Sequence, residues 1–327
     1  TLVSFLPRRV SLIIGANLGR LCGVLFAKRR KLAEKNMALA MPKLSPEQVE
    51  IEISGMYEHL GILAMDVLNL KRFHDEPELS RYFDFENLKN LNDAYGLGKG
   101  VLILTGHLGN WEAGSCFLPK LGFPTAFIAK RMKNPRMDNF IKAIREQGGA
   151  EMIDAKRGAR KILKALGKGK VVCVLMDQHN REGIAADFFD RPARTTTMMV
   201  KVAMKTGAPV IPAFTFRTEE NRYTTSFGKP MVFAESANNE VVKLRNILRN
   251  ATTSLNPQCA ASPRSGSGFT IAGSSKQLLA LLQLRNSSNQ HQPDTDSDHQ
   301  GSGDVVDGPD IPLFHQKMIE GFPAAGV

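Results

Sequence analysis

The stretch Val101-Leu-Ile-Leu-Thr-Gly-His-Leu-Gly-Asn-Trp-Glu-Ala-Gly114 passes from an apolar run into a glycine-flanked polar turn. The apolar residues at 101–104 predict a buried strand. Gly106 and Gly109 permit a tight turn after it, and Asn110 is a suitable N-cap for the helix that follows. The stretch therefore predicts a strand, a turn and a helix in direct succession, which is the repeating unit of α/β proteins.

Two side chains of this turn, His107 and Glu112, can carry acid–base chemistry. On a continuous helix, residues five apart lie about 140° apart and would not meet, whereas the predicted turn folds His107 back over the helix start. The helix N-terminus favours an ionised Glu112. A carboxylate that accepts from one imidazole nitrogen makes the other nitrogen a stronger base. We therefore predict that His107 is a general base oriented by Glu112; the alternative is a chance pairing at this spacing.

The alternation of strand and helix continues along the chain. Apolar runs predict further strands at 124–129, 171–176 and 209–214, with helices at 111–121, 136–147, 157–168 and 196–206. This order predicts an α/β fold with a largely parallel sheet flanked by helices. One more strand is expected within 222–234, and its place in the sheet is left open.

The N-terminal segment has a different character. Apolar positions recur at helical spacing between Val10 and Phe26, and basic clusters stand on both sides of them. Two interpretations remain open: a helix lying on an anionic membrane surface, or an amphipathic helix packed on the body. No run approaches the roughly 20 apolar residues of a membrane span. Further on, Ser45-Pro-Glu-Gln48 predicts a helix start with a capping box.

The net charge of the chain is +11, and it is unevenly distributed. Residues 246–327 hold five Lys and Arg but seven Asp and Glu, so the preceding part carries +13. A basic body predicts an anionic partner, and the lack of a nucleic-acid-binding motif disfavours nucleic acid. The four cysteines lie far apart without a CxxC pair, which predicts neither a disulfide framework nor a zinc site.

Residues 101–114 resemble the catalytic segment of the bacterial lipid A biosynthesis (lauroyl/myristoyl) acyltransferases. These belong to the lysophospholipid acyltransferase superfamily, whose motif is HxxxxD/E, typically within T-G-H-x-G-N-W-E. Further segments agree with the family pattern: Met176-Asp177-Gln178, Asp187–Thr195, Gly207–Pro212 with Phe216-Arg217, and upstream Arg29-Arg30, Asn36 and Pro42. The resemblance covers roughly residues 1–245 and implies a fold like that of the glycerolipid acyltransferases.

The chain departs from the family pattern at two places. Asp190 stands where a glycine is usual. The family also closes with P-E-x-W-x-W-x-H-x-R-W-K, and this chain has no tryptophan after Trp111. Codons chosen for residues 266–274 and read in another frame encode W-F-W-I-H-N-R-W-K, so we hypothesise a frameshift in the tail. A divergent or linker tail is the alternative, and an independent gene sequence decides between them.

Three segments are expected from these observations. Residues 1–75 form a helical, membrane-associating segment, and residues 76–250 form the α/β acyltransferase domain. Residues 251–327 form a frame-shifted, disordered tail. Within it, residues 286–310 are mostly Ser, Asn, Gln, Asp, His and Gly, a composition that cannot bury enough apolar surface to fold. The chain opens at Thr1 without a methionine, from which we expect an earlier natural start.

The resemblance implies an enzyme of lipid A and lipopolysaccharide biosynthesis at the cytoplasmic face of the bacterial inner membrane. A fatty acyl group would pass from acyl carrier protein or coenzyme A to a glycolipid hydroxyl, with no cofactor or metal, because the thioester is already activated. His107 and Glu112 are the implied catalytic residues. The implied substrate-binding residues are Asn110, Arg131, Arg145, Asp177, Gln178 and Arg217. Alternatives are another glycolipid or a lysophospholipid as acceptor, or a non-catalytic lipid-binding protein on a membrane surface.

Overall fold

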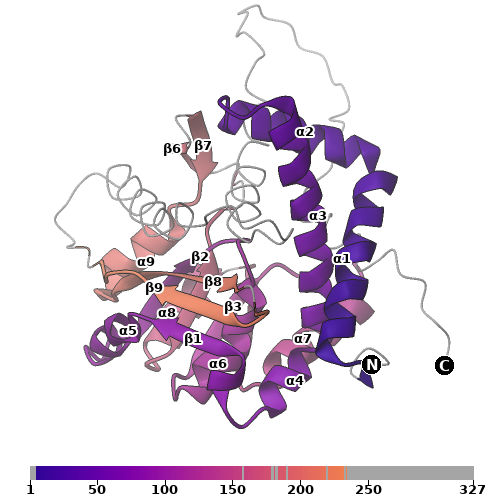
Figure 1. Cartoon of the computed structure of the whole chain (residues 1–327). Helices are drawn as coiled ribbons and strands as arrows, with labels where there is room; N and C mark the ends of the chain where they lie inside the picture. The colour runs from indigo at the N-terminus through magenta and orange to yellow at the C-terminus, as the bar shows by residue number, and fades with distance from the viewer. Residues whose placement is uncertain are drawn as a thin grey trace, which may run out of the picture.

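The computed structural model in Figure 1 describes residues 5–156, 158–177, 180, 183–188, 191–218, 220–231 and 233. The tail predicted at 251–327 therefore lies outside the described residues, and so does Gln178. The three segment boundaries remain predictions.

A seven-stranded sheet forms the centre of the molecule, in the order β1-β9-β8-β2-β5-β3-β4. Its strands are β1 (Phe83–Glu86), β2 (Val101–Thr105), β3 (Thr125–Ala129), β4 (Glu151–Asp154), β5 (Val171–Leu175), β8 (Val210–Arg217) and β9 (Tyr223–Phe227). Neighbouring strands run parallel except for the antiparallel pair β8 and β9. The predicted fold class is confirmed. The strand expected within 222–234 is β9, between β1 and β8.

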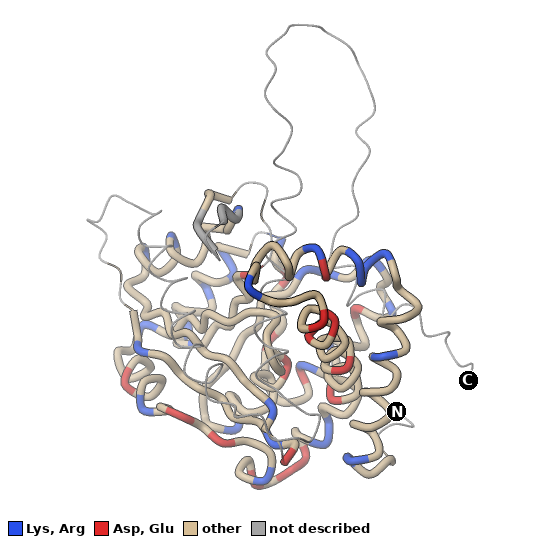
Figure 2. The backbone as a smooth tube through the Cα atoms, turned by 45° about the horizontal axis from the view of Figure 1, so that its top comes forward, with Lys and Arg blue, Asp and Glu red and all other residues tan. Residues whose placement is uncertain are grey.

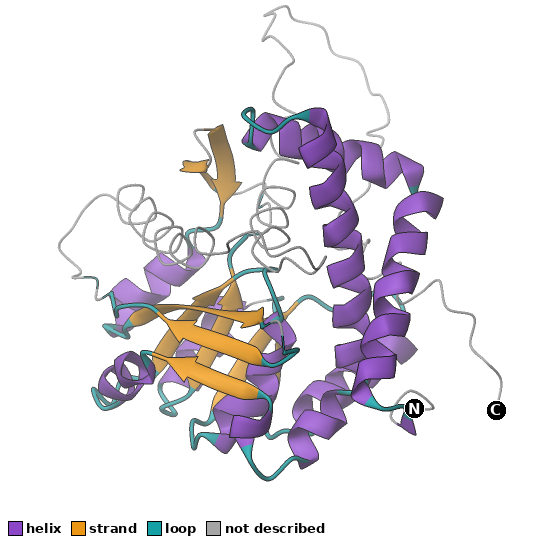
Figure 3. Cartoon of the chain, in the orientation of Figure 1, coloured by secondary structure: helices purple, strands orange, loops and turns teal. Residues whose placement is uncertain are grey.

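Helices cover both faces of the sheet (Figure 3). One face packs against α8 (Gly158–Leu166) and α9 (Met198–Thr206). The other packs against α4 (Leu70–Asp75), α5 (Leu88–Tyr95), α6 (Gly114–Lys120) and α7 (Pro135–Glu146). Because side chains alternate along a strand, Leu102 of β2 enters the first core and Ile103 enters the second. Burial on both faces explains the continuous apolar run at 101–104.

Four strands were not predicted. β1 and β4 are the edge strands, and each has four residues of which two are acidic, so their apolar signal is weak. Edge strands tolerate such charges because one side of the strand faces solvent. The other two, β6 (Ile184–Phe188) and β7 (Arg191–Thr195), form an antiparallel pair apart from the main sheet.

Three long helices precede the sheet: α1 (Arg8–Leu25), α2 (Ala27–Ala40) and α3 (Pro46–Leu68). The predicted capping box is present, with Ser45 and Gln48 bonded to each other's backbone. α1 and α3 lie side by side (Figure 1), and glycines at the contact let their backbones approach closely. A Cβ on Gly19 would stand 2.1 Å from the Tyr57 carbonyl oxygen, so a larger residue would push the helices apart.

The large apolar side chains of α1 face outward. Ile13 is 60% exposed, Leu21 51% and Val24 72%, whereas the buried positions are mostly Gly, Ala and Ser. A helix on a water-soluble protein normally buries its large apolar residues, so this stripe is typical of an interaction surface. No single helix of the described chain is long and apolar enough to cross a membrane. α1 and α2 pass that test together, across a bend of 92°.

Candidate active site

The register of the sheet brings His107 and Asp177 together. Thr105, the last residue of β2, lies opposite Leu175, the last residue of β5. His107 and Asp177 each stand two positions beyond that pair. The two residues therefore emerge at the same edge, outside the carboxyl ends of parallel strands, where open α/β sheets carry their ligand sites.

The carboxylate of Asp177 holds His107 at two points. The backbone N–H of His107 donates to Oδ2 at 2.6 Å, and the ring Nδ1 lies 2.9 Å from Oδ1. An ionised carboxylate only accepts, so Nδ1 carries the proton and Nε2 the lone pair. A Cβ at Gly106 would lie 3.0 Å from Oδ2, so the glycine gives the buried carboxylate room to reach the turn.

Glu112 forms a two-point ion pair with Arg145 of α7. Nε of Arg145 lies 2.7 Å from Oε2, and Nη2 lies 2.5 Å from Oε1. Nε1 of Trp111 donates to the same Oε1 at 3.1 Å, and the Trp111 ring packs edge-on against the His107 imidazole, with centroids 5.0 Å apart. The orientation of His107 by Glu112 stays a prediction. In the structure Nδ1 donates its hydrogen bond to Asp177, which the strand register places opposite the ring.

The turn after β2 is supported by β8. Gly109 has a φ of 61°, and a Cβ there would lie 2.0 Å from the carbonyl oxygen of Thr215. The same oxygen accepts a hydrogen bond from the backbone N–H of Asn110 at 2.8 Å. Asn110 is the predicted N-cap, since its Oδ1 accepts from the backbone N–H of Ala113 at 3.2 Å. Asn110 is buried at 1% exposure, and its substrate contact stays a prediction.

A buried histidine of α3 also supports this turn. Nε2 of His59 lies 3.1 Å from the carbonyl oxygen of Gly109. Burial, with the nearby Arg217 charge as a second cause, lowers the pKa of His59 to about 4. The ring is therefore neutral at physiological pH. Sequence reasoning missed His59, because a single histidine in an apolar helix carries no spacing signal that links it to residue 109.

The three arginines that were predicted to bind substrate lie in three different environments. Arg145 reaches the turn through Glu112. Arg131 follows β3 and is 76% exposed, with its Nε 3.3 Å from a carboxylate oxygen of Asp154. Arg217 ends β8, is 7% exposed and donates to Oδ1 of Asn221 at 3.0 Å. Substrate contacts of these arginines stay predictions.

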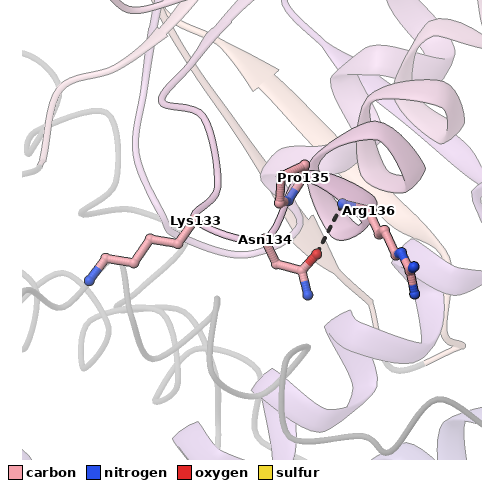
Figure 4. A pocket seen from close by; sticks show the side chains of 4 residues that line it. All are labelled: Lys133, Asn134, Pro135 and Arg136. Carbon is pink, nitrogen blue, oxygen red and sulfur yellow. Dashed lines mark hydrogen bonds between the residues drawn. The ribbon is translucent and has the colours of Figure 1, made fainter.

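A basic depression of about 730 Å³ opens at the start of α7, on the same edge of the sheet as His107. Figure 4 shows its lining residues, Lys133, Asn134, Pro135 and Arg136. Oδ1 of Asn134 caps the helix by accepting from the Arg136 backbone N–H at 2.9 Å.

In the described residues, no group of three or more His, Cys, Asp or Glu side chains could hold a metal ion.

The site thus offers an imidazole with a defined tautomer, oriented by a buried carboxylate at the edge of the sheet. Such a group can take a proton from a hydroxyl as the hydroxyl attacks an electrophile. The arrangement suits general-base chemistry on an activated carbonyl.

The chain is similar to several known acyltransferases. The chain is 24% identical over 230 residues to the lipid A biosynthesis acyltransferase of Haemophilus influenzae, which covers 70% of each protein. It is 26% identical to the lipid A biosynthesis palmitoleoyltransferase of Escherichia coli, over 56% of this chain and 60% of that one. It is 28% identical to the phosphatidylinositol mannoside acyltransferase of Mycobacterium tuberculosis, over 41% of this chain and 45% of that one.

Among solved structures, the chain is similar to the 1-acyl-sn-glycerophosphate acyltransferase of Thermotoga maritima. The identity is 15% and the TM-score 0.37, over 79% of this chain and 100% of that one. The fold assignment rests on the sheet described above.

The sequence profile of the bacterial lipid A biosynthesis acyltransferases matches residues 1–252. The match spans every helix and strand of the described structure, including the turn, Arg145 and Asp177. The chain therefore belongs to the bacterial lipid A biosynthesis acyltransferase family, whose members transfer acyl groups to lipids.

Proposed function

We propose that this protein transfers a fatty acyl group from a thioester of acyl carrier protein or coenzyme A to a hydroxyl of a lipid A-type glycolipid. The hydrogen bond between Nδ1 of His107 and Oδ1 of Asp177, at 2.9 Å, carries the proposal. It leaves the lone pair on Nε2, which is the atom that general-base catalysis requires. The names of the relatives support a lipid acceptor.

The proposed reaction proceeds in two steps. Nε2 of His107 takes the proton of the acceptor hydroxyl while its oxygen attacks the thioester carbonyl. The tetrahedral intermediate then expels the thiolate, which takes the proton from Nε2, so the enzyme returns to its starting state. Asp177 remains ionised and stabilises the imidazolium between the steps. General-base catalysis of this kind contributes roughly 10²–10⁴-fold to a rate.

Glu112 has a supporting role in this proposal. Its carboxylate joins Arg145 to the Trp111 indole, and the indole packs against the His107 ring. The ion pair thus supports the imidazole through Trp111, while Asp177 accepts the hydrogen bond of Nδ1. The alternative is that Glu112 orients His107 by direct contact, as the sequence predicts.

We also propose that the protein acts at the cytoplasmic face of the inner membrane. The outward stripe of α1 supplies apolar side chains that can enter the lipid interface. Basic residues recur along the neighbouring α2 (Figure 2). Lysine and arginine beside an apolar stripe favour an anionic membrane surface.

The first experiment assays His107→Ala with thioesters of acyl carrier protein and of coenzyme A, against a panel of glycolipid and lysophospholipid acceptors. We expect acyl transfer to disappear while binding to anionic vesicles persists. Unchanged acyl transfer would remove His107 from the mechanism. Vesicle binding by a wild-type protein that transfers no acyl group from either donor would favour the lipid-binding alternative.

A second experiment tests the membrane surface. Val24→Asp on α1 should weaken sedimentation with anionic vesicles. Leu97→Asp is the matched control, because Leu97 is a comparably exposed apolar residue, 56% exposed, in the loop before β2 at the opposite edge of the sheet. Equal vesicle binding by the two variants would exclude α1 as the docking surface.

A further inference from the structure

His59 links α3 to the turn that follows β2 and carries His107. Its imidazole is 8% exposed, and its Nε2 contacts the Gly109 carbonyl oxygen at 3.1 Å. The same helical turn of α3 carries Tyr57 and Gly61, whose backbones touch the glycines of α1. One turn of α3 therefore contacts α1 and the segment that carries His107.

The hydrogen bond to Gly109 has a defined direction. A carbonyl oxygen only accepts, so Nε2 of His59 carries the hydrogen and donates it. Burial lowers the pKa of His59 to about 4, so the ring is neutral at physiological pH, and the contact with the Gly109 carbonyl oxygen keeps the hydrogen on Nε2. His59 is therefore a constant donor, unlike His107, which gains and loses a proton in the proposed reaction.

The Gly109 carbonyl oxygen lies in the middle of the turn, where a hydrogen bond restricts the backbone on both sides. Gly109 is two residues after His107 and has a left-handed backbone, with the Thr215 carbonyl oxygen against its Cα. Asp177 binds the turn at the His107 N–H, and β8 binds it at the Asn110 N–H. His59 supplies a third attachment between those two.

We propose that His59 is a positioning residue for the catalytic base. By donating to the Gly109 carbonyl it holds the turn at the position where Nδ1 of His107 reaches Asp177. Loss of the donor lets the turn shift and lengthens the His107–Asp177 hydrogen bond. The kinetic part of this inference rests on the proposed function.

The test compares three substitutions of His59. Gln places an amide N–H2 close to the position of Nε2, Leu removes the donor, and Asn is polar but too short to reach Gly109. We expect kcat to fall roughly 10- to 100-fold in His59→Leu and His59→Asn with KM little changed, because a displaced base lowers the chemical step. His59→Gln should keep most of the activity.

The matched control is Thr125→Val at the amino end of β3. Oγ1 of Thr125 is buried and donates to the Phe123 carbonyl oxygen at 2.7 Å, so this change also deletes a side-chain hydrogen bond to a backbone carbonyl. It should lower stability without lowering kcat. Equal kcat in His59→Leu and Thr125→Val, or in His59→Gln and His59→Asn, would overturn the proposal.

A second measurement does not depend on acyl transfer. In ¹⁵N-histidine-labelled protein, the Nδ1–H signal of His107, assigned with His107→Ala, reports the hydrogen bond to Asp177. The signal should shift in His59→Leu and return in His59→Gln. An unchanged signal in a folded His59→Leu would overturn the positioning role even if no acyl acceptor had been found.

Discussion

Asp177 contacts His107 at both the backbone N–H and ring Nδ1, so its carboxylate sets the tautomer as well as the position of the imidazole. Asp177→Asn keeps the size of the side chain but can present an amide N–H to Nδ1, which favours the wrong tautomer. We expect kcat to fall about 10³–10⁴-fold with an unchanged unfolding midpoint. Steady-state kinetics and urea unfolding measure the two quantities. Activity within twofold of wild type would show that another group sets the tautomer.

Glu112 and Arg145 form an ion pair, so the effect of replacing one of them on stability depends on whether the other is present. The two side chains are 4% and 17% exposed, so Arg145→Met leaves a nearly buried carboxylate without its partner. This single change should cost about 3–5 kcal/mol in the free energy of unfolding. The double variant Glu112→Gln, Arg145→Met should recover part of that loss. Additive losses in urea unfolding would contradict a coupled pair.

The packing of α1 on α3 gives a prediction at the scale of elements. Gly19→Ala would place a Cβ 2.1 Å from the Tyr57 carbonyl oxygen, so the two helices must separate. We expect a loss of about 1–3 kcal/mol and faster hydrogen exchange in α1. Gly167→Ala is the control, because its Cβ would meet its nearest atom at an ordinary 3.4 Å. If hydrogen exchange in α1 of Gly19→Ala is unchanged, the two helices accommodate the added methyl group without loss of stability.

Prediction of elements from the sequence succeeded where burial is two-sided. β2, β3, β5 and β8 lie inside the sheet, and their apolar runs were sufficient to predict them. The edge strands β1 and β4 were missed, since burial on fewer sides demands fewer apolar residues. α3 was predicted from its capping box, which is a local signal that needs no tertiary contact.

At the scale of the whole molecule, His59 makes stability depend on pH. Its pKa is about 4 in the folded protein against 6.5 for the unperturbed group. Between these values the unfolded chain binds a proton that the folded chain does not, so folding weakens as the pH falls. The contribution is complete above pH 6.5 and is lost toward pH 4, by about 3 kcal/mol.

Urea unfolding of wild type and His59→Gln measures this contribution. The stability difference between the two proteins should shift by about 3 kcal/mol in favour of the variant between pH 7 and pH 4. Burial raises the pKa of Asp66, so Asp66 stabilises the folded protein as the pH falls. Because both proteins contain Asp66, its effect cancels in the stability difference. A pH-independent difference would mean that His59 takes up a proton in the folded state.

The sequence by itself determined the strand, turn and helix at 101–114, the α/β class, and His107 as the candidate base. These features depend on local signals: an apolar run, permissive glycines, an N-cap, and a motif contained within a few residues. The family resemblance added Asp177 and Arg145 as site residues without showing how they are joined.

The tertiary structure decided the partners. His107 meets Asp177 because Thr105 and Leu175 stand opposite each other in the sheet. Glu112 meets Arg145 because α7 lies against the helix start, and His59 meets Gly109 because α3 packs over the turn. Each contact joins residues 33 to 70 positions apart, so only the packing of whole elements could bring them together.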